Sequence, residues 1–276
     1  MNCLELFSGT HSVGKVCEQL GWNTVSVDML LPADHQVDIM SFDYKQYPKD
    51  HFGVIWASPP CTNYSHLKGC WFGRKLKDGT IYTKEQNALD QDEADKLVLK
   101  SLEIINYFQP EIWFLENPQT GNLKNRPIME HLPFYDVDYC MYSDWGYKKR
   151  TRIWTNKEGW HGCLCDKSGA CGNMITIPTD GAVRHDTGKP LKGETRTLHF
   201  NQLCKSETIR ALRKHKANLG GHRYEMVDGK MTLCNTKELR KQNPKHKNCV
   251  QNVGGGTNRL ERYRIPEDLI FSLFLD

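Results

Sequence analysis

The sequence predicts an α/β fold: a doubly wound, mostly parallel sheet joined to a small irregular domain. Three observations support this. Short apolar runs alternate with helical patterns up to residue 155, small or polar residues follow the ends of the runs, and clear periodicity is lost over residues 156–252. Alternating strands and helices are typical of parallel sheets with helices on both faces. We therefore expect a sheet domain of residues 1–155 and 253–276, and an inserted domain of residues 156–252.

Each element follows from its local pattern. Strands are expected where apolar residues run together, and helices where they recur every three or four positions. The expected strands are Cys3–Phe7, Thr24–Val27, Val54–Ala57, Ile112–Leu115 and the end of Lys148–Trp154, and the expected helices are Val13–Leu20, Asp90–Phe108 and Ser206–His215. The stretch Tyr263–Leu275 regains apolar spacing, so it is expected to pack back on the sheet domain.

Length and composition indicate a globular protein that works inside a cell. The chain has 276 residues, of which 38% are hydrophobic, enough for one large domain or one domain with an appendage. No apolar run approaches the roughly 18 residues of a membrane span, and the first 20 residues lack a signal-peptide pattern. Eleven cysteines without such a signal favour a reducing compartment.

The net charge of +4 hides an asymmetry. Residues 147–250 carry a net charge of +13, whereas the remainder of the chain carries −9. A basic segment beside an acidic one indicates a part that binds a polyanion, joined to a part with another task. The alternative is a lysine-rich surface that is merely solvated.

The first chemically distinctive segment is Phe7-Ser8-Gly9-Thr10, which follows the first strand and precedes a helix. Gly9 lets the backbone approach a ligand, and the helix N-terminus offers unpaired N–H groups. Asp28, at the end of the second strand, is placed to bind ribose hydroxyls. Asp38-Ile39, expected at a further strand end, could contact an adenine ring. The alternative for the first segment is an ordinary strand–helix turn.

Three further groups follow strand ends or enter a strand. Cys61, after Ser58-Pro59-Pro60, is expected to be a rigid, exposed thiol suited to nucleophilic attack, the alternative being a structural cysteine. Glu116 ends an apolar strand, where desolvation would let it donate a proton; the alternative is a capping or solvated carboxylate. Arg150 and Arg152 share one face of a strand and could reach one site, unless that strand is a surface edge.

Taken in order, these motifs resemble the C5-cytosine methyltransferases, most closely the short phage and large-virus members. The resemblance covers about 60% of the chain, residues 1–155 and more weakly 263–274. It makes the sheet domain a Rossmann-like catalytic domain that binds S-adenosylmethionine, and residues 156–252 a target-recognition domain. The family's Gly-Asn near the C-terminus is replaced here by Arg262-Tyr263, and its Gln before the arginine motif by Lys148.

The resemblance also implies a role for each site residue. Phe7, Ser8, Gly9 and Thr10 would form the S-adenosylmethionine loop, Asp28 would hold the ribose, Met29 would pack on adenine, and Asp38 and Ile39 would contact its edge. Cys61 would attack cytosine C6 from a loop shaped by Pro60 and Ser65. Glu116 would hold N3 and the amino group, and Arg152, with Arg150 beside it, would bind the O2 side.

The expected activity is therefore methyl transfer to C5 of a flipped cytosine in double-stranded DNA. We expect a monomer, with no membrane association, in the cytoplasm or nucleus, wherever the DNA is. The same chemistry on RNA is the nearest alternative, because one branch of the family methylates tRNA. A catalytically silent nucleic-acid-binding protein with the same fold is the second.

The inserted segment contains a possible structural zinc site. Cys163, Cys165 and Cys171 lie within nine residues, and His161 or His185 could complete four ligands. Cys234, His246 and Cys249 form a second, looser group. The alternative is a set of reduced thiols without metal.

Overall fold

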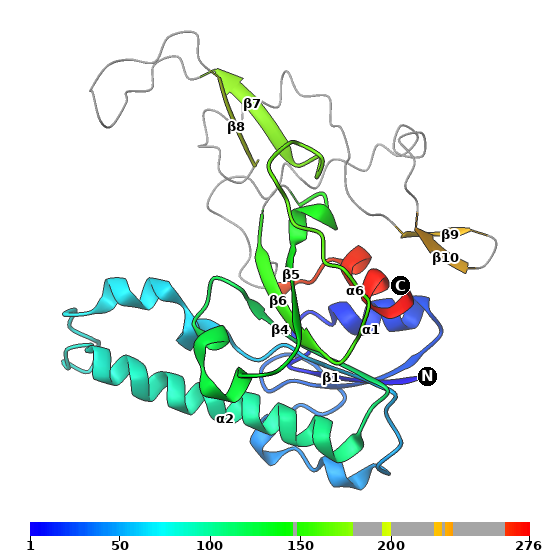
Figure 1. The fold of residues 1–276 in the computed structure, drawn as a ribbon. Helices are drawn as coiled ribbons and strands as arrows, with labels where there is room; N and C mark the ends of the chain where they lie inside the picture. Colours follow the sequence, from blue (N-terminus) through cyan, green and yellow to red (C-terminus); the bar gives the residue numbers. More distant parts are fainter. Residues whose placement is uncertain (146–147, 179–194, 200–223, 228–229, 234–262) are drawn as a thin grey trace.

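A six-stranded sheet forms the centre of the computed structural model (Figure 1). The structure describes residues 1–145, 148–178, 195–199, 224–227, 230–233 and 263–276. The strand order is β2-β1-β3-β4-β6-β5, with bounds β1 Asn2–Leu6, β2 Asn23–Val27, β3 Val54–Ala57, β4 Ile112–Pro118, β5 Phe134–Asp138 and β6 Arg150–Thr155. The first four strands are mutually parallel, and β6 runs antiparallel to both β4 and β5.

Helices cover both faces of the sheet. The helices are α1 Ser12–Gln19, α2 Lys84–Phe108 and α6 Glu267–Leu275. Because strand side chains alternate between faces, Leu4 and Leu6 pack in the core beneath α2, whereas Cys3 packs in the core beneath α1 and α6. Figure 1 shows α1 and α6 side by side, with α2 on the opposite side of the sheet.

Several connections contain short 3-10 turns. They are η1 Ile39–Ser41, η2 Tyr44–Gln46, η3 Thr62–Tyr64, η4 His66–Trp71, η5 Leu123–Asn125, η6 Pro127–Met129 and η7 Tyr139–Met141. Two hairpins follow β6: β7 Met174–Pro178 pairs with β8 Thr195–His199, and β9 Tyr224–Val227 pairs with β10 Lys230–Leu233. Within the described ranges, no helix has the length and apolar character needed to cross a bilayer.

The predicted fold class is confirmed: the sheet is mostly parallel and wound on both faces. The helix expected over Asp90–Phe108 begins earlier, at Lys84, because the Thr83 side chain accepts a hydrogen bond from the Gln86 N–H and caps the first turn. Strand β5 was not predicted from its sequence. The helix expected over Ser206–His215 lies outside the described residues, and the proposed division into two domains stays a prediction.

The C-terminal segment packs on the sheet domain as expected. Trp22 stacks on Phe274 with ring centroids 5.1 Å apart, and Ile265 donates its N–H to Ser12 Oγ over 3.2 Å. Trp160 Nε1 donates to Ser272 Oγ over 2.9 Å. Helix α6 therefore completes the core that α1 begins.

Candidate active site

The predicted site residues gather at one edge of the sheet. Leu6 is in register with Val27 and with Ala57, so the turns that follow β1, β2 and β3 all leave the sheet at the same edge. Ala57 is in register with Leu115, and Glu116 therefore reaches the same edge. Since β6 is antiparallel, it begins there, with Arg150 and Arg152. This is the edge at which parallel α/β sheets bind their ligands.

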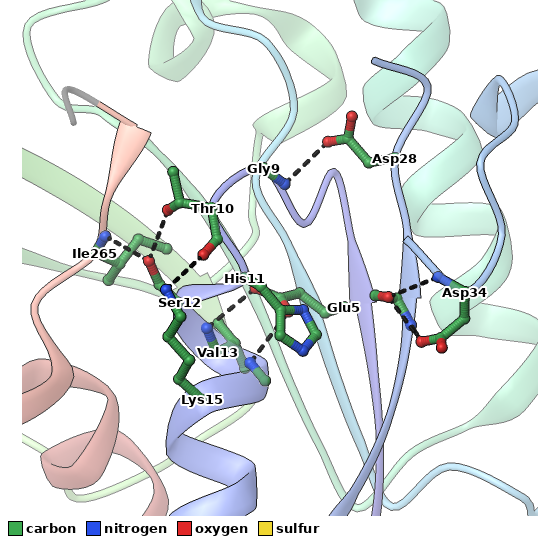
Figure 2. A network of polar contacts seen from close by, with 12 residues as sticks. Glu5, Gly9, Thr10, His11, Ser12, Val13, Lys15, Asp28, Asp34 and Ile265 are labelled. Carbon is green, nitrogen blue, oxygen red and sulfur yellow. Dashed lines mark hydrogen bonds and ion pairs between the residues drawn. The ribbon is translucent and has the colours of Figure 1, made fainter. Parts of the chain in front are cut away.

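A buried carboxylate holds the turn between β1 and α1 (Figure 2). Glu5 accepts hydrogen bonds from the N–H groups of Val13 (3.0 Å) and Gly14 (3.1 Å), which are among the unpaired donors of the helix N-terminus. His11 Nδ1 lies 2.9 Å from Glu5 Oε2, and this hydrogen bond raises the pKa of His11. Glu5 thus fixes where α1 starts, and with it the shape of the preceding turn.

The turn itself, Phe7 to Thr10, presents backbone and one buried hydroxyl. Gly9 has a φ of +53°, a conformation that side-chain-bearing residues rarely adopt. Its N–H donates to Asp28 Oδ2 over 2.9 Å, linking the ends of β1 and β2 (Figure 2). The buried Ser8 Oγ has no hydrogen-bond partner among the described residues. An unpaired buried hydroxyl beside a glycine turn fits a site completed by a polar ligand.

Asp28 is held rigidly by the backbone around it. Its Oδ1 accepts hydrogen bonds from the N–H groups of Leu30 and Leu31, both at 2.8 Å. Oδ2 accepts only the Gly9 N–H, so this oxygen keeps a lone pair that could accept a hydrogen bond from a sugar hydroxyl. The neighbouring Met29 is 56% exposed and is available to pack on a flat ligand.

Asp38 and Ile39 do not lie at a strand end, so that expectation is wrong. They lie in the connection between β2 and β3, where Asp38 caps the 3-10 turn η1 by accepting the Met40 N–H over 2.9 Å. A side-chain cap competes with strand pairing, and this explains the local structure. Ile39 is buried in the core beneath α2.

Cys61 lies in a loop that is hydrogen-bonded to the end of β4. Asn117 Nδ2, at the end of β4, donates to the Pro59 carbonyl over 2.9 Å, and the Cys61 carbonyl accepts the Tyr64 N–H over 3.1 Å. The exposed Pro60 fixes the backbone just before the thiol. Cys61 itself is half-buried, not fully exposed as predicted, and the Asn117–Pro59 hydrogen bond holds its loop against the end of β4.

The surroundings of Cys61 shift the pKa of its thiol in opposite directions. Burial, and after it the charge of Glu116, raise the pKa of the Cys61 thiol, whereas Lys149 lowers it. Glu116 is buried, which excludes the solvated carboxylate considered above. Its Oε1 accepts a hydrogen bond from the Tyr139 hydroxyl over 3.0 Å and lies 3.5 Å from Lys149 Nζ.

The arginine pair is held by an aspartate pair on the neighbouring strand. Arg150 donates from Nε and Nη2 to Asp138 (3.0 and 2.7 Å), and Arg152 donates likewise to Asp136 (2.8 and 2.9 Å). The Arg152 guanidinium also lies 3.5 Å from the centroid of the Phe134 ring. Strand β6 lies between β4 and β5, so it is not the surface edge strand considered above.

These bonds leave both guanidiniums with N–H groups to spare, because each has five donors and uses two. Burial opposes ionisation of Asp138, but hydrogen bonds from Arg150 and from the Cys165 N–H outweigh it, so the pKa of Asp138 lies below its ordinary value. The aspartates were not predicted as site residues. Their signal was present: Asp136-x-Asp138 matches the spacing of Arg150-x-Arg152.

The predicted zinc ligands are only partly brought together. Cys165 and Cys171 lie in a buried cluster whose other members are Cys140 and His199, and we call these four residues the thiol cluster. Cys163 instead packs against the core beneath α1 and α6, and the exposed His161 is not part of the cluster. The other candidate residues, His185, Cys234, His246 and Cys249, lie outside the described residues.

Comparison with known proteins identifies the family. The chain is 42% identical over 207 residues to the "Probable DNA (cytosine-5)-methyltransferase" of Frog virus 3 (isolate Goorha), a match that covers 72% of this chain and 94% of the viral protein. The chain belongs to the DNA (cytosine-5)-methyltransferase family. This confirms the resemblance drawn from the motifs, and it makes the protein a methyltransferase, for which the family implies S-adenosylmethionine as methyl donor.

No family model matches the sequence of this methyltransferase. Among solved structures, it is similar to the methyltransferase EhMeth of Entamoeba histolytica, with 13% identity, 99% of this chain and 96% of that chain covered, and a TM-score of 0.48. A DNMT2 mutant of Spodoptera frugiperda covers 60% of this chain and 53% of its own, with 15% identity and a TM-score of 0.35. Both superpositions are loose, so the family assignment rests on the viral relative.

Proposed function

We propose that this methyltransferase transfers a methyl group to C5 of a cytosine flipped out of double-stranded DNA, with Cys61 as the nucleophile. The observation that carries the proposal is the meeting of Cys61, Glu116 and the arginine pair at one sheet edge, beside the Ser8–Gly9 turn. Cytosine C5 is unreactive until a nucleophile adds at C6. A thiol placed beside a buried carboxyl and a cation supplies the groups that such an addition needs.

The proposed reaction begins at Cys61. Its thiolate sulfur forms a bond to C6 while the Glu116 carboxyl, held by Tyr139, gives a proton to N3, so that the electron pair of the C5–C6 double bond becomes available at C5. When bound, S-adenosylmethionine supplies the electrophilic methyl group that C5 attacks. A base then removes the C5 proton, the C6–sulfur bond breaks so that Cys61 leaves as a thiolate, and N3 returns its proton to the Glu116 carboxylate.

The remaining residues would bind and orient the methyl donor and the target cytosine. Ser8, Gly9 and Asp28 would hold the methyl donor, with Phe7 and Thr10 shaping the turn and Met29 packing on its adenine. Arg152, aimed by Asp136, would donate to cytosine O2, and Arg150 would support it from the same face. The half-burial of Cys61 at a sheet edge supports the proposal that the target base leaves the duplex, because enzymes that act on a base inside a duplex take it out of the stack.

Double-stranded DNA is the proposed substrate for two reasons. The viral relative is named for action on DNA. In addition, residues 147–250 carry a net charge of +13, which suits contacts with a phosphate backbone. Such contacts position the protein without reading sequence.

The test is transfer of labelled methyl from S-adenosylmethionine to mixed duplex DNA and, in parallel, to total RNA, followed by digestion to nucleosides. We expect label in 5-methyldeoxycytidine. Cys61→Ala should abolish transfer while calorimetry still detects binding of the methyl donor. Cys70→Ala is the matched control, because Cys70 is an exposed cysteine of the nearby 3-10 turn η4, and it should keep wild-type transfer.

A duplex that contains 5-fluorocytosine tests the covalent step. Fluorine cannot leave C5 as a proton does, so the Cys61–C6 bond should persist as a complex that survives denaturing gels. Label in 5-methylcytidine would move the enzyme to RNA, and methyl-donor binding without transfer to either polymer would indicate a silent protein. Undiminished transfer by Cys61→Ala would disprove the nucleophile.

A further inference from the structure

Beside the arginine pair, but made of residues that the proposed methyl transfer does not use, a cluster of four metal-binding side chains lies in the interior. They come from three separate segments: Cys140 from η7, Cys165 and Cys171 from the stretch between β6 and β7, and His199 from the end of β8. All four are buried, and their ligand atoms lie within 4.8 Å of one another. Three cysteines and one histidine that converge on one point form a ligand set typical of structural zinc sites.

The distances from His199 to two of the three thiols match those of a tetrahedral zinc site. Bonds of about 2.3 Å to sulfur and about 2.05 Å to nitrogen, meeting at the tetrahedral angle, place sulfur and nitrogen about 3.6 Å apart. His199 Nε2 lies 3.6 Å from Cys165 Sγ and 3.7 Å from Cys171 Sγ. No disulfide joins Cys140, Cys165 or Cys171 to another described cysteine. Three thiolates and one imidazole favour zinc over magnesium or calcium, which take oxygen ligands.

The backbone around the cluster is already fixed by hydrogen bonds from a second layer. Asn173 Nδ2 lies within hydrogen-bond distance of the carbonyls of Cys140 (2.8 Å), Ser143 (2.7 Å) and Cys171 (3.0 Å). The Cys165 N–H donates to Asp138 Oδ2 over 2.8 Å. Structural zinc sites depend on such outer partners to orient their ligands.

The residues around the thiol cluster provide little apolar packing that could stabilise this region without a metal. Apart from its cysteines, the local hydrophobic cluster contains Met174, with Met141 packed against it. The stretch between β6 and β7 is a run of loops and turns. Segments of this kind are commonly stabilised by a bound metal.

We propose that Cys140, Cys165, Cys171 and His199 bind one structural zinc ion, which fastens the inserted segment to the strands that carry the arginine pair. The link is direct, because Asp138 accepts from the Cys165 N–H and from Arg150 at the same time. Zinc would therefore hold β8 and the stretch before β7 in place and, through Asp138, support the position of Arg150.

The experiment uses the full chain, produced in zinc-containing medium and purified without added metal. Elemental analysis should give about one more zinc ion per wild-type chain than per Cys171→Ser chain. Cys163→Ser is the matched control: Cys163 lies two residues from Cys165 but outside the cluster, so this variant should keep all its zinc. X-ray absorption at the zinc edge of the wild-type chain should show three sulfur neighbours and one nitrogen, a readout that does not depend on whether a variant folds.

Wild-type protein without stoichiometric zinc would overturn the site, and so would a zinc content unchanged by Cys171→Ser. Loss of zinc from Cys163→Ser, or a coordination shell other than three sulfurs and one nitrogen, would overturn the ligand set. None of these readouts depends on methyl transfer, so the zinc site and the proposed function can fail separately.

Discussion

At the scale of single residues, the pKa of the Cys61 thiol depends on opposing effects of its neighbours. Burial and Glu116 disfavour the thiolate that attack requires, and Lys149 favours it. The same lysine lies 3.5 Å from Glu116 Oε1 and 4.5 Å from the centroid of the Tyr139 ring. Its cation thus compensates for placing a nucleophile beside a carboxylate.

Replacing this cation should make the thiol less reactive near neutral pH. In Lys149→Met, the pKa of Cys61 should rise further, so that a smaller fraction is thiolate at any pH below it. We expect alkylation of Cys61 by iodoacetamide at a pH of about 8 to slow about threefold, which corresponds to about half a pKa unit. The ascending limb of the pH–rate profile for methyl transfer should move to higher pH.

Lys148→Met is the matched control. Lys148 is the adjacent lysine, but it contacts the Cys165 carbonyl and Asp138 instead of Glu116. If both variants shift the profile equally, or if Lys149→Met shifts it to lower pH, the balance described for Cys61 is wrong.

Whether the sequence could predict one of these residues depends on its position relative to a strand end. Cys61, Glu116 and Asp28 follow or end apolar runs, and parallel strands bring such positions to one edge. Lys149 and Tyr139 could not be chosen in this way, since they reach Glu116 only after β5 and β6 pair with the sheet. Asp38 and Ile39 were misplaced because Asp38 caps a 3-10 turn instead of following a strand.

At the scale of elements, α6 is a short helix that contributes many buried residues to the core. Leu269, Ile270 and Leu273 are fully buried against the face of the sheet that α1 also covers. The segment was expected to return to the sheet because its apolar spacing resumes at Tyr263. In contrast, β5 was missed: its sequence, Phe-Tyr-Asp-Val-Asp, places acidic residues where a strand needs apolar ones, and the partner arginines compensate for them.

Two leucines of α6 provide a matched pair for stability. Leu273→Ala should lower the free energy of unfolding by about 3 kcal/mol, because it leaves a cavity beneath the helix. Leu275→Ala should change it by less than about 0.5 kcal/mol, because Leu275 is 42% exposed. Urea denaturation followed by tryptophan fluorescence measures both. Equal effects of the two substitutions would contradict the packing of α6 described here.

At the scale of the whole molecule, charge is divided between two parts of the chain. The net +13 of residues 147–250 stands against the net −9 of the rest. The division was visible in the sequence, but which of these cations face a partner depends on residues outside those the structure describes. The basic part is proposed to bind the phosphate backbone, and the acidic part is proposed to bind the small methyl donor.

This division predicts that salt affects the two substrates differently. A protein that contacts about six phosphates loses on the order of 10³ in affinity as salt rises from about 50 to about 200 mM. We expect the KM for duplex DNA to rise steeply over this range, whereas the KM for S-adenosylmethionine should change less than about twofold. Steady-state methyl transfer at several salt concentrations measures both. A KM for DNA that does not depend on salt would contradict phosphate contact by the basic part.

The hydrogen bond between Ile265 and Ser12 joins residues 253 positions apart, and it has a consequence for biosynthesis. While the ribosome is still translating the inserted segment, the apolar side of α1, formed by Val13, Val16 and Cys17, lacks the helix that covers it in the finished fold. Until translation reaches α6, the nascent chain therefore carries an open hydrophobic surface, which is the condition under which chaperones bind and aggregation competes. Only translation of α6 removes this exposure.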